Sequence, residues 1–146
     1  MNTEPIEILM AEDNEDDVIL IQEAFEAAKI INILNVVQDG EEAMAYLRKE
    51  GKYKSANRPG LVMLDINMPK KNGLEVLEEI KNDPDLKQIP VIMLTVSVRE
   101  EDVIRAYSSG ANTYVRKPVK FDEFRQIIGQ FALYWTLVAT IPKERV

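Results

Sequence analysis

Residues 61–73 read LVMLDINMPKKNG and mark the centre of the predicted fold. The first four residues are apolar and are bounded by turn-forming residues, which is typical of a short strand buried on both faces. The apolar run ends at a carboxylate, Asp65, and Pro69 and Asn72-Gly73 then predict a loop before a helix. Ligands of open parallel sheets bind beyond the carboxyl ends of the strands, so Asp65 is a candidate functional residue.

The rest of the chain alternates between short apolar runs and amphipathic segments. Strands are predicted at residues 6–11, 34–37, 61–65, 90–95 and 113–116. Helices are predicted up to about residue 28, at 40–47, at 74–82, at 100–108 and from 121 onward, with a long loop at 51–60. Five β-α units predict an α/β fold with a parallel sheet covered on both faces, in the flavodoxin-like (βα)5 strand order 2-1-3-4-5.

Composition excludes several classes of function. The 146 residues suit one domain, and they include no cysteine or histidine, so there is no disulfide, no thiolate metal site and no histidine base. A net charge of −7 argues against binding to nucleic acid. The N-terminus is polar, and the longest nearly apolar run, 131–141, is too short to span a bilayer. We expect a cytoplasmic domain that inserts in no membrane.

Polar residues stand at the carboxyl ends of four of the predicted strands. Glu12 and Asp13 follow the first strand, Asp65 and Thr95 end the third and fourth, and Lys117 follows the fifth. In the predicted order these strands are neighbours, so the five side chains would share one rim of the sheet. Three clustered carboxylates repel one another unless a cation joins them. Oxygen ligands without His or Cys favour a hard divalent ion such as Mg²⁺.

These residues together describe a phosphoryl-transfer site. A carboxylate can attack phosphorus, while a metal ion, a lysine and a hydroxyl stabilise the phosphoryl oxygens. Each residue alone has an ordinary explanation, since acids favour helix N-termini and lysines are common on surfaces. The coincidence of all five at the strand ends favours the chemical explanation.

The combined motif resembles the signature of the receiver domain of two-component response regulators. It consists of Glu12-Asp13, the segment LDINMP at 64–69, Thr95 and Lys117-Pro118, and the resemblance covers about residues 6–130. It implies that Asp65 accepts a phosphoryl group from a sensor histidine kinase or a phosphotransfer protein. It also implies a Mg²⁺ site formed by Glu12, Asp13, Asp65 and the backbone carbonyl of Asn67.

The same resemblance implies a conformational switch. Thr95 and Lys117 would bind the attached phosphoryl group, and the ring of Tyr114 would turn inward as Thr95 moves. A downstream protein target would then read the surface formed by the fourth helix, the fifth strand and the fifth helix. Val96, after Thr95, is larger than the small residues usual at that position in the family. We therefore expect slow hydrolysis of the aspartyl phosphate.

The C-terminal segment predicts an interface. After a core at about 6–130, residues 131–146 form a predicted helical extension that is apolar on several sides, with Tyr134, Trp135 and Leu137 as candidate interface residues. A tail folded back on its own domain is the alternative. The tail and the loop at 51–60 resemble small regulators paired with cyanobacterial and other bacterial phytochromes, which implies a stand-alone receiver that forms a homodimer through its fourth and fifth helices.

Two other functions stay open on the sequence. The first is a receiver-like docking module that is never phosphorylated, although it retains Glu12, Asp13, Asp65, Thr95 and Lys117. The second is a phosphohydrolase, which would usually need a second acid near the nucleophile. Asn67, two residues after Asp65, cannot do acid–base work, and no capping insertion is visible. We therefore expect a signalling protein and not an enzyme.

Overall fold

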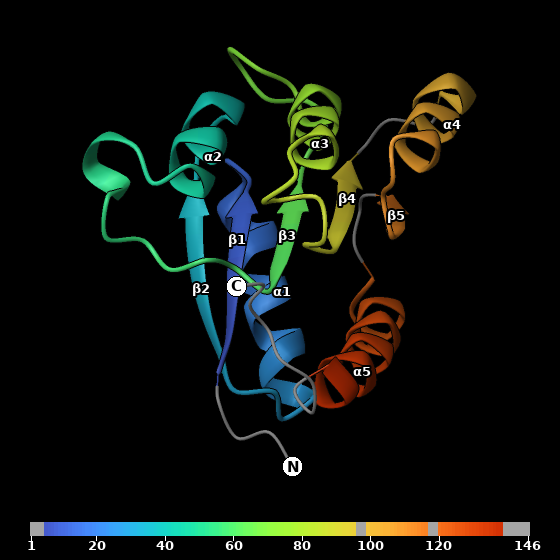
Figure 1. The fold of residues 1–146 in the computed structure, drawn as a ribbon. Helices are drawn as coiled ribbons and strands as arrows, with labels where there is room; N and C mark the ends of the chain where they lie inside the picture. The colour runs from blue at the N-terminus through green and yellow to red at the C-terminus, as the bar shows by residue number, and fades with distance from the viewer. Residues whose placement is uncertain (1–4, 96–98, 117–119, 139–146) are drawn as a thin grey trace.

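The computed structural model describes residues 5–95, 99–116 and 120–138, with the side chains of Thr95 and of 131–138 outside that description. Within these ranges five parallel strands form one sheet in the order β2-β1-β3-β4-β5 (Figure 1). The strands are β1 (Ile6–Ala11), β2 (Asn32–Val37), β3 (Leu61–Leu64), β4 (Val91–Thr95) and β5 (Thr113–Arg116). The predicted α/β fold and strand order are therefore confirmed.

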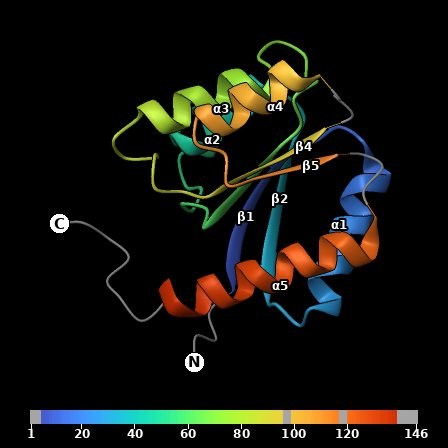
Figure 2. The same ribbon diagram turned by 90° about the vertical axis from the view of Figure 1, so that its right-hand side faces the viewer.

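Helices cover both faces of the sheet. They are α1 (Glu15–Ala27), α2 (Gly40–Leu47), α3 (Gly73–Asn82), α4 (Glu100–Ser108) and α5 (Phe121–Val138). Figure 2 shows α2, α3 and α4 on one side of the sheet and α1 and α5 on the other. This three-layer arrangement places the carboxyl ends of the strands along one rim.

The hydrophobic core has one half on each face of the sheet. Val62 and Leu64 of β3 belong to the half beneath α2 and α3, while Met63 belongs to the half beneath α1 and α5. On the second face the rings of Phe25 and Phe124 meet edge to face, with centroids 6.5 Å apart, and so join α1 to α5. The central strand is buried on both faces, as its unbroken apolar sequence predicts.

Strand β2 is longer than the sequence indicated. It begins at Asn32 instead of residue 34, and it pairs with β1 over six positions, from Ile6–Asn32 to Ala11–Val37. Asn32 and Asn35 interrupt the apolar pattern, so the strand looks weak in the sequence. The ladder with β1 supplies the stabilisation that the pattern lacks.

The connection between α2 and β3 contains a short 3₁₀ helix, η1 (Gly51–Tyr53), where the sequence indicated only a loop. The Tyr53 hydroxyl donates a hydrogen bond to Glu42 Oε1 at 2.7 Å, and its ring lies 5.3 Å from that of Tyr46. Burial and the bond to Glu42 raise the pKa of Tyr53 to about 12. The Tyr53 side chain therefore holds this connection against α2.

Helix α5 is continuous to Val138, so the predicted extension begins as part of α5. The side chains of Tyr134, Trp135 and Leu137 lie outside the described residues, as does the whole of 139–146. In the described part of the chain, no helix combines the length and the apolar character needed to cross a membrane.

Helix α2 ends with a lysine in a left-handed conformation. Lys49 has φ 56°, its N–H bonds to the Tyr46 carbonyl at 3.1 Å, and the Glu50 N–H bonds to the Ala45 carbonyl at 2.9 Å. Because the Cβ of a non-glycine residue is strained there, Lys49→Gly should raise the free energy of unfolding by about 1 kcal/mol in urea titrations. Gly110, with φ 102° after α4, gives the control: Gly110→Ala should lower stability. A loss of stability in Lys49→Gly would contradict this reading.

Candidate functional site

The carboxyl ends of β1 and β3 bring three acids together. Ala11 and Leu64 are paired across these strands, and the Asp65 N–H donates to the Ala11 carbonyl at 3.2 Å. Glu12 and Asp65, the next residues of the two strands, therefore stand at the same level. One carboxylate oxygen from each of Glu12, Asp13 and Asp65 lies within 4.8 Å of the other two.

Two of these three carboxylates are buried. Glu12 is 1% exposed and Asp65 is 6% exposed, whereas Asp13 faces solvent. Glu12 Oε2 accepts a hydrogen bond from the Asn14 N–H at 3.1 Å, and Asn14 in turn caps α1 through the Asp17 N–H. Buried carboxylates at this separation repel strongly unless a cation lies between them. The all-oxygen donor set fits Mg²⁺, and Asp13 leaves the site open to solvent.

Hydrogen bonds of the loop after β3 hold the Asp65 carboxylate in place. The Asn67 N–H donates to Asp65 Oδ1 at 3.0 Å, and the Gly73 N–H donates to the Ile66 carbonyl at 3.0 Å. A Cβ atom on Gly73 would lie 2.3 Å from the Asp65 carbonyl oxygen, closer than real Cβ atoms approach. Glycine is therefore needed here for close contact. The sequence indicated only a turn at this residue.

The same loop is fixed against the start of α2, which sequence reasoning missed. The Lys70 ammonium lies 3.6 Å from Asp39 Oδ2, and Asp39 also caps α2 by accepting the Glu42 N–H at 2.9 Å. A Cβ atom on Gly40 would lie 2.0 Å from the Lys71 carbonyl oxygen. The pair Asp39-Gly40 indicated a turn into a helix, but its contact with the loop 65–73 depends on the tertiary fold.

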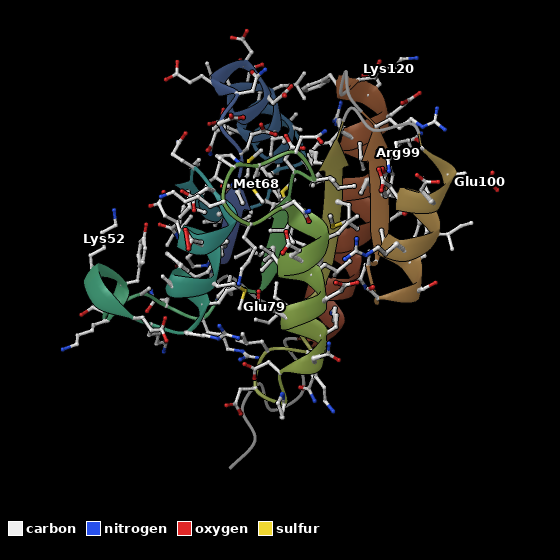
Figure 3. The ribbon with its side chains drawn as sticks, turned by 90° about the horizontal axis from the view of Figure 1, so that it is seen from above. Lys52, Met68, Glu79, Arg99, Glu100 and Lys120 are labelled. Atoms are coloured by element: carbon white, nitrogen blue, oxygen red, sulfur yellow. The ribbon has the colours of Figure 1, made fainter. Side chains whose placement is uncertain are left out.

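Thr95 and Lys117 are described only in part. Thr95 is the last residue of β4, and it pairs with Arg116, the last residue of β5. Its backbone is therefore at the same rim, while its side chain and the whole of Lys117 lie outside the described residues. Figure 3 looks down on this rim, where Met68 and Arg99 mark the connections that follow β3 and β4. The roles of Thr95 and Lys117 stay predictions.

Tyr114, the predicted switch residue, is half-buried on β5. Its backbone N–H donates to the hydroxyl oxygen of Tyr107 at 3.1 Å, and the two rings lie 6.5 Å apart at 39°. Tyr107 of α4 therefore contacts the edge of β5 directly. Sequence reasoning did not select Tyr107, because this contact joins a helix face to a neighbouring strand.

Helix α4 is also tied to α3. Arg105 donates two hydrogen bonds to the Glu78 carboxylate, at 2.9 and 2.8 Å, and this contact lowers the pKa of Glu78. Both side chains are more than one-third exposed, so the pair contributes little to stability. Its bidentate geometry nevertheless fixes the position of α4 relative to α3.

A five-stranded parallel sheet of this order, with acids at the ends of β1 and β3, is the architecture of a signalling receiver. The family described as "Response regulator receiver domain" matches residues 8–129, and the chain belongs to it.

Comparison with individual proteins shows which members of this family the chain resembles. Among curated proteins the chain is similar to the response regulator Rcp1 of Synechocystis sp., with 41% identity over 138 residues that cover 94% of each chain. Among solved structures it is similar to the phosphorylated cyanobacterial phytochrome response regulator RcpA, at 44% identity and a TM-score of 0.81, covering 96% of this chain and 100% of that one. The Mn²⁺-bound form of Rcp1 is similar at 40% identity and a TM-score of 0.80, covering 94% and 99%.

The protein is therefore a response regulator with a receiver domain, related to Rcp1 and RcpA. Receiver domains bind Mg²⁺ in an acidic pocket, and the cluster of Glu12, Asp13 and Asp65 fits that site. Membership of the family also implies interaction with a histidine kinase or a downstream partner.

Proposed function

We propose that Asp65 is the phosphoacceptor and that a sensor histidine kinase or a phosphotransfer protein is the donor. The single observation that carries this assignment is the position of Asp65. It is the buried carboxylate at the end of the central strand, within 4.8 Å of two further carboxylates, and the Asn67 N–H orients one of its oxygens. An oriented carboxylate next to a cation site is a suitable nucleophile toward phosphorus.

The other residues of the rim take supporting roles. Glu12 and Asp13 would hold Mg²⁺ together with Asp65 and the Asn67 carbonyl, with Glu12 acting mostly through water. When bound, Mg²⁺ would neutralise charge on the phosphoryl oxygens during transfer. Thr95 and Lys117 are assigned to the attached phosphoryl group by their place in the motif. The oriented Asp65 carboxylate forms the new O–P bond as the P–N bond of the donor's phosphohistidine breaks, and the imidazole leaves with the donor.

The output is assigned to the surface formed by α4, β5 and α5. Tyr107 and Ile104 of α4 are more than half exposed there, and the Tyr107 hydroxyl contacts the backbone of Tyr114. A change at Tyr114 would therefore reach α4 through one hydrogen bond. We assign a downstream protein target and a homodimer contact to this surface, the latter extended by Tyr134, Trp135 and Leu137.

Similarity to RcpA supports a phytochrome kinase as the donor. We further propose a cytoplasmic signalling protein that is not an enzyme, and the net charge of −7 argues against binding to nucleic acid. The alternative is a docking module that is never phosphorylated. The buried acids Glu12 and Asp65 favour the first proposal, because a docking module needs no such costly pair.

The test is phosphorylation of the purified protein by acetyl phosphate. With Mg²⁺, intact mass should show one added phosphoryl group, and peptide mapping should place it on Asp65. With EDTA in place of Mg²⁺ no group should be added. If no adduct forms, beryllofluoride replaces the donor: failure of Mg²⁺ and beryllofluoride to change the elution or the thermal stability of the protein would overturn the proposal in favour of the docking module.

Val96 should set the lifetime of the phosphorylated protein. It follows Thr95 in the sequence and lies outside the described residues, and the resemblance to the family implies that a bulky side chain at this position hinders an attacking water molecule. Val96→Ala should therefore lose its phosphoryl group severalfold faster after acetyl phosphate is removed, as followed by intact mass. Ile104→Ala, a change on the exposed face of α4, is the control and should leave the rate unchanged. Equal lifetimes for Val96→Ala and wild type would contradict the prediction.

A further inference from the structure

Exposed apolar side chains gather at one edge of the sheet. In the described part of the chain the strongly exposed large hydrophobic residues are Ile19, Ile31, Ile33, Val36, Ile104 and Tyr107. The last two lie on α4, whereas Ile31, Ile33 and Val36 lie on β2 or directly before it. Figure 1 shows β2 at the outer edge of the sheet, opposite β5.

Ile19 belongs to the same surface. The Gln22 side-chain amide of α1 donates to Asn32, the first residue of β2, at 3.3 Å. Residues three apart share a helix face, so Ile19 lies on the side of α1 that faces this edge. Four of the six exposed apolar side chains are therefore on or beside β2.

The backbone of β2 presents hydrogen-bonding groups outward. The carbonyls of Ile31 and Val37 accept hydrogen bonds from the β1 side, from the Ile6 and Glu12 N–H groups. Peptide groups alternate in direction along a strand, so Leu34 and Val36 direct their N–H and C=O groups away from β1. Outside the β1 ladder, no backbone hydrogen bond among residues 5–95, 99–116 and 120–138 reaches Leu34 or Val36.

The sequence of this edge strand lacks two of the usual forms of protection. Residues 30–38 contain no charge and no proline, in a chain with a net charge of −7. Edge strands of monomeric proteins are commonly protected by lysine, proline or a covering segment. The opposite edge, β5, ends in Arg116, and the Tyr107 hydroxyl accepts its Tyr114 N–H. The β5 edge therefore carries a charge and a hydrogen bond to a neighbouring helix, whereas the β2 strand is uncharged.

We propose that the β2 edge pairs with β2 of a second copy of this chain, antiparallel, about a two-fold axis that passes through Asn35. Such an axis is perpendicular to the sheet, so each face of the sheet continues into the same face of the second copy. Leu34 then stands opposite Val36 of the second copy, and the two residues exchange their outward N–H and C=O groups. One sheet runs through both molecules.

Charge favours this edge over other contacts between copies. Residues 30–38 form an uncharged strip, while the net charge of −7 opposes the close approach of two copies elsewhere.

The side chains fit the same arrangement. Leu34 packs against the core half beneath α1 and α5, so Val36, two residues along, lies on that face too. Ile19 lies on the side of α1 that faces this edge. Pairing therefore covers the Val36 side chains of both copies and leaves Ile19 at the border of the contact. This interface lies at the opposite edge of the sheet from the α4–β5–α5 surface, and it does not depend on phosphorylation of Asp65.

The first test uses a cysteine introduced on the axis, because the natural chain has none. Two copies of residue 35 would be directly opposite in a non-hydrogen-bonded pair, with Cα atoms about 4.5 Å apart, within the range of a disulfide. Asn35→Cys should form a covalent dimer on mild oxidation. Ile33→Cys is the matched control: it is on the same face, but its two copies would be about 14 Å apart along the strands.

Oxidation of both variants under identical conditions should give a covalent dimer for Asn35→Cys and monomer for Ile33→Cys. Equal cross-linking of the two, or no cross-linking of Asn35→Cys, would overturn the proposed pairing. Far-UV circular dichroism and labelling by acetyl phosphate show that each variant is folded, so a failure of the site at Asp65 is distinguished from a failure of this interface.

The second test uses the unlinked protein. Val36→Lys puts like charges next to the axis and should raise the dimer dissociation constant about tenfold or more in sedimentation velocity experiments. Ile104→Lys makes the same kind of change on α4, where it weakens only the separate contact assigned to the α4–β5–α5 surface, and it should leave association through β2 in place. A monomeric wild type at high protein concentration, or association lost in Ile104→Lys but kept in Val36→Lys, would overturn the proposal.

Discussion

Asp65→Asn should accept no phosphoryl group from acetyl phosphate, and without Mg²⁺ it should be more stable than the wild type. The amide of asparagine lacks the nucleophilic carboxylate oxygen. The substitution also removes one of three negative charges within 4.8 Å of one another, two of them on buried side chains. Relief of that repulsion should raise the free energy of unfolding by about 1–2 kcal/mol.

Addition of Mg²⁺ should make the wild type more stable than Asp65→Asn. A ligand that binds only the folded protein stabilises it according to its concentration and affinity. Wild type should therefore gain stability as Mg²⁺ is added, and Asp65→Asn should gain much less because it has lost a ligand. Urea titrations with and without Mg²⁺ measure both effects. Asp85→Asn, a change at an exposed aspartate between α3 and β4, should match the wild type in both conditions.

Two results would contradict this account of the site. One is a phosphoryl group on Asp65→Asn, which would move the acceptor to another residue. The other is equal stabilisation of the variant and the wild type by Mg²⁺, which would mean that Asp65 contributes nothing to the cation site.

Gly73→Ala should lose about 3 kcal/mol of stability. The new Cβ would meet the Asp65 carbonyl oxygen at 2.3 Å and its carbon at 2.8 Å. Both atoms are backbone, so the start of α3 or the end of β3 must move. The hydrogen bond from the Gly73 N–H to the Ile66 carbonyl would be strained as well.

Gly129→Ala supplies the matched control, because a Cβ atom there meets nothing within 4 Å and the residue lies inside α5. It should gain about 1 kcal/mol from its helix propensity. Urea denaturation measures both changes. Gly73→Ala should also slow labelling by acetyl phosphate at temperatures where it is folded, since displacing the Asp65 backbone moves the nucleophile. Unchanged stability and labelling would show that the loop adapts without cost.

The fold could be predicted because hydrophobic burial dominates it. The run at 61–64 has no polar residue to place on a solvent face, which only a central strand tolerates. β2 was placed less well, because at the edge of the sheet Asn32 and Asn35 can take strand positions with little penalty. The ladder with β1, which no local pattern reveals, determines where it begins.

The site could be predicted only where a functional residue stands at the end of a strand. Glu12, Asp13 and Asp65 were selected because neighbouring parallel strands bring their next residues together. Tyr107 and the pair Glu78–Arg105 were missed, because their contacts join elements that are separate in the sequence. Gly40 and Gly73 look like ordinary turn glycines until the backbone that each one approaches is known.

Gly40 and Gly73 also make the contacts around the loop 65–73 more rigid than those that hold α4. Backbone contacts that leave no room for a methyl group fix the loop 65–73 to α2 and to the start of α3. On the other side α4 is attached by exposed side chains, the Glu78–Arg105 pair and the Tyr107 hydroxyl. A strain that arises at Asp65 would therefore be released toward β4, β5 and α4, so the packing would set the direction of the proposed signal before phosphorylation.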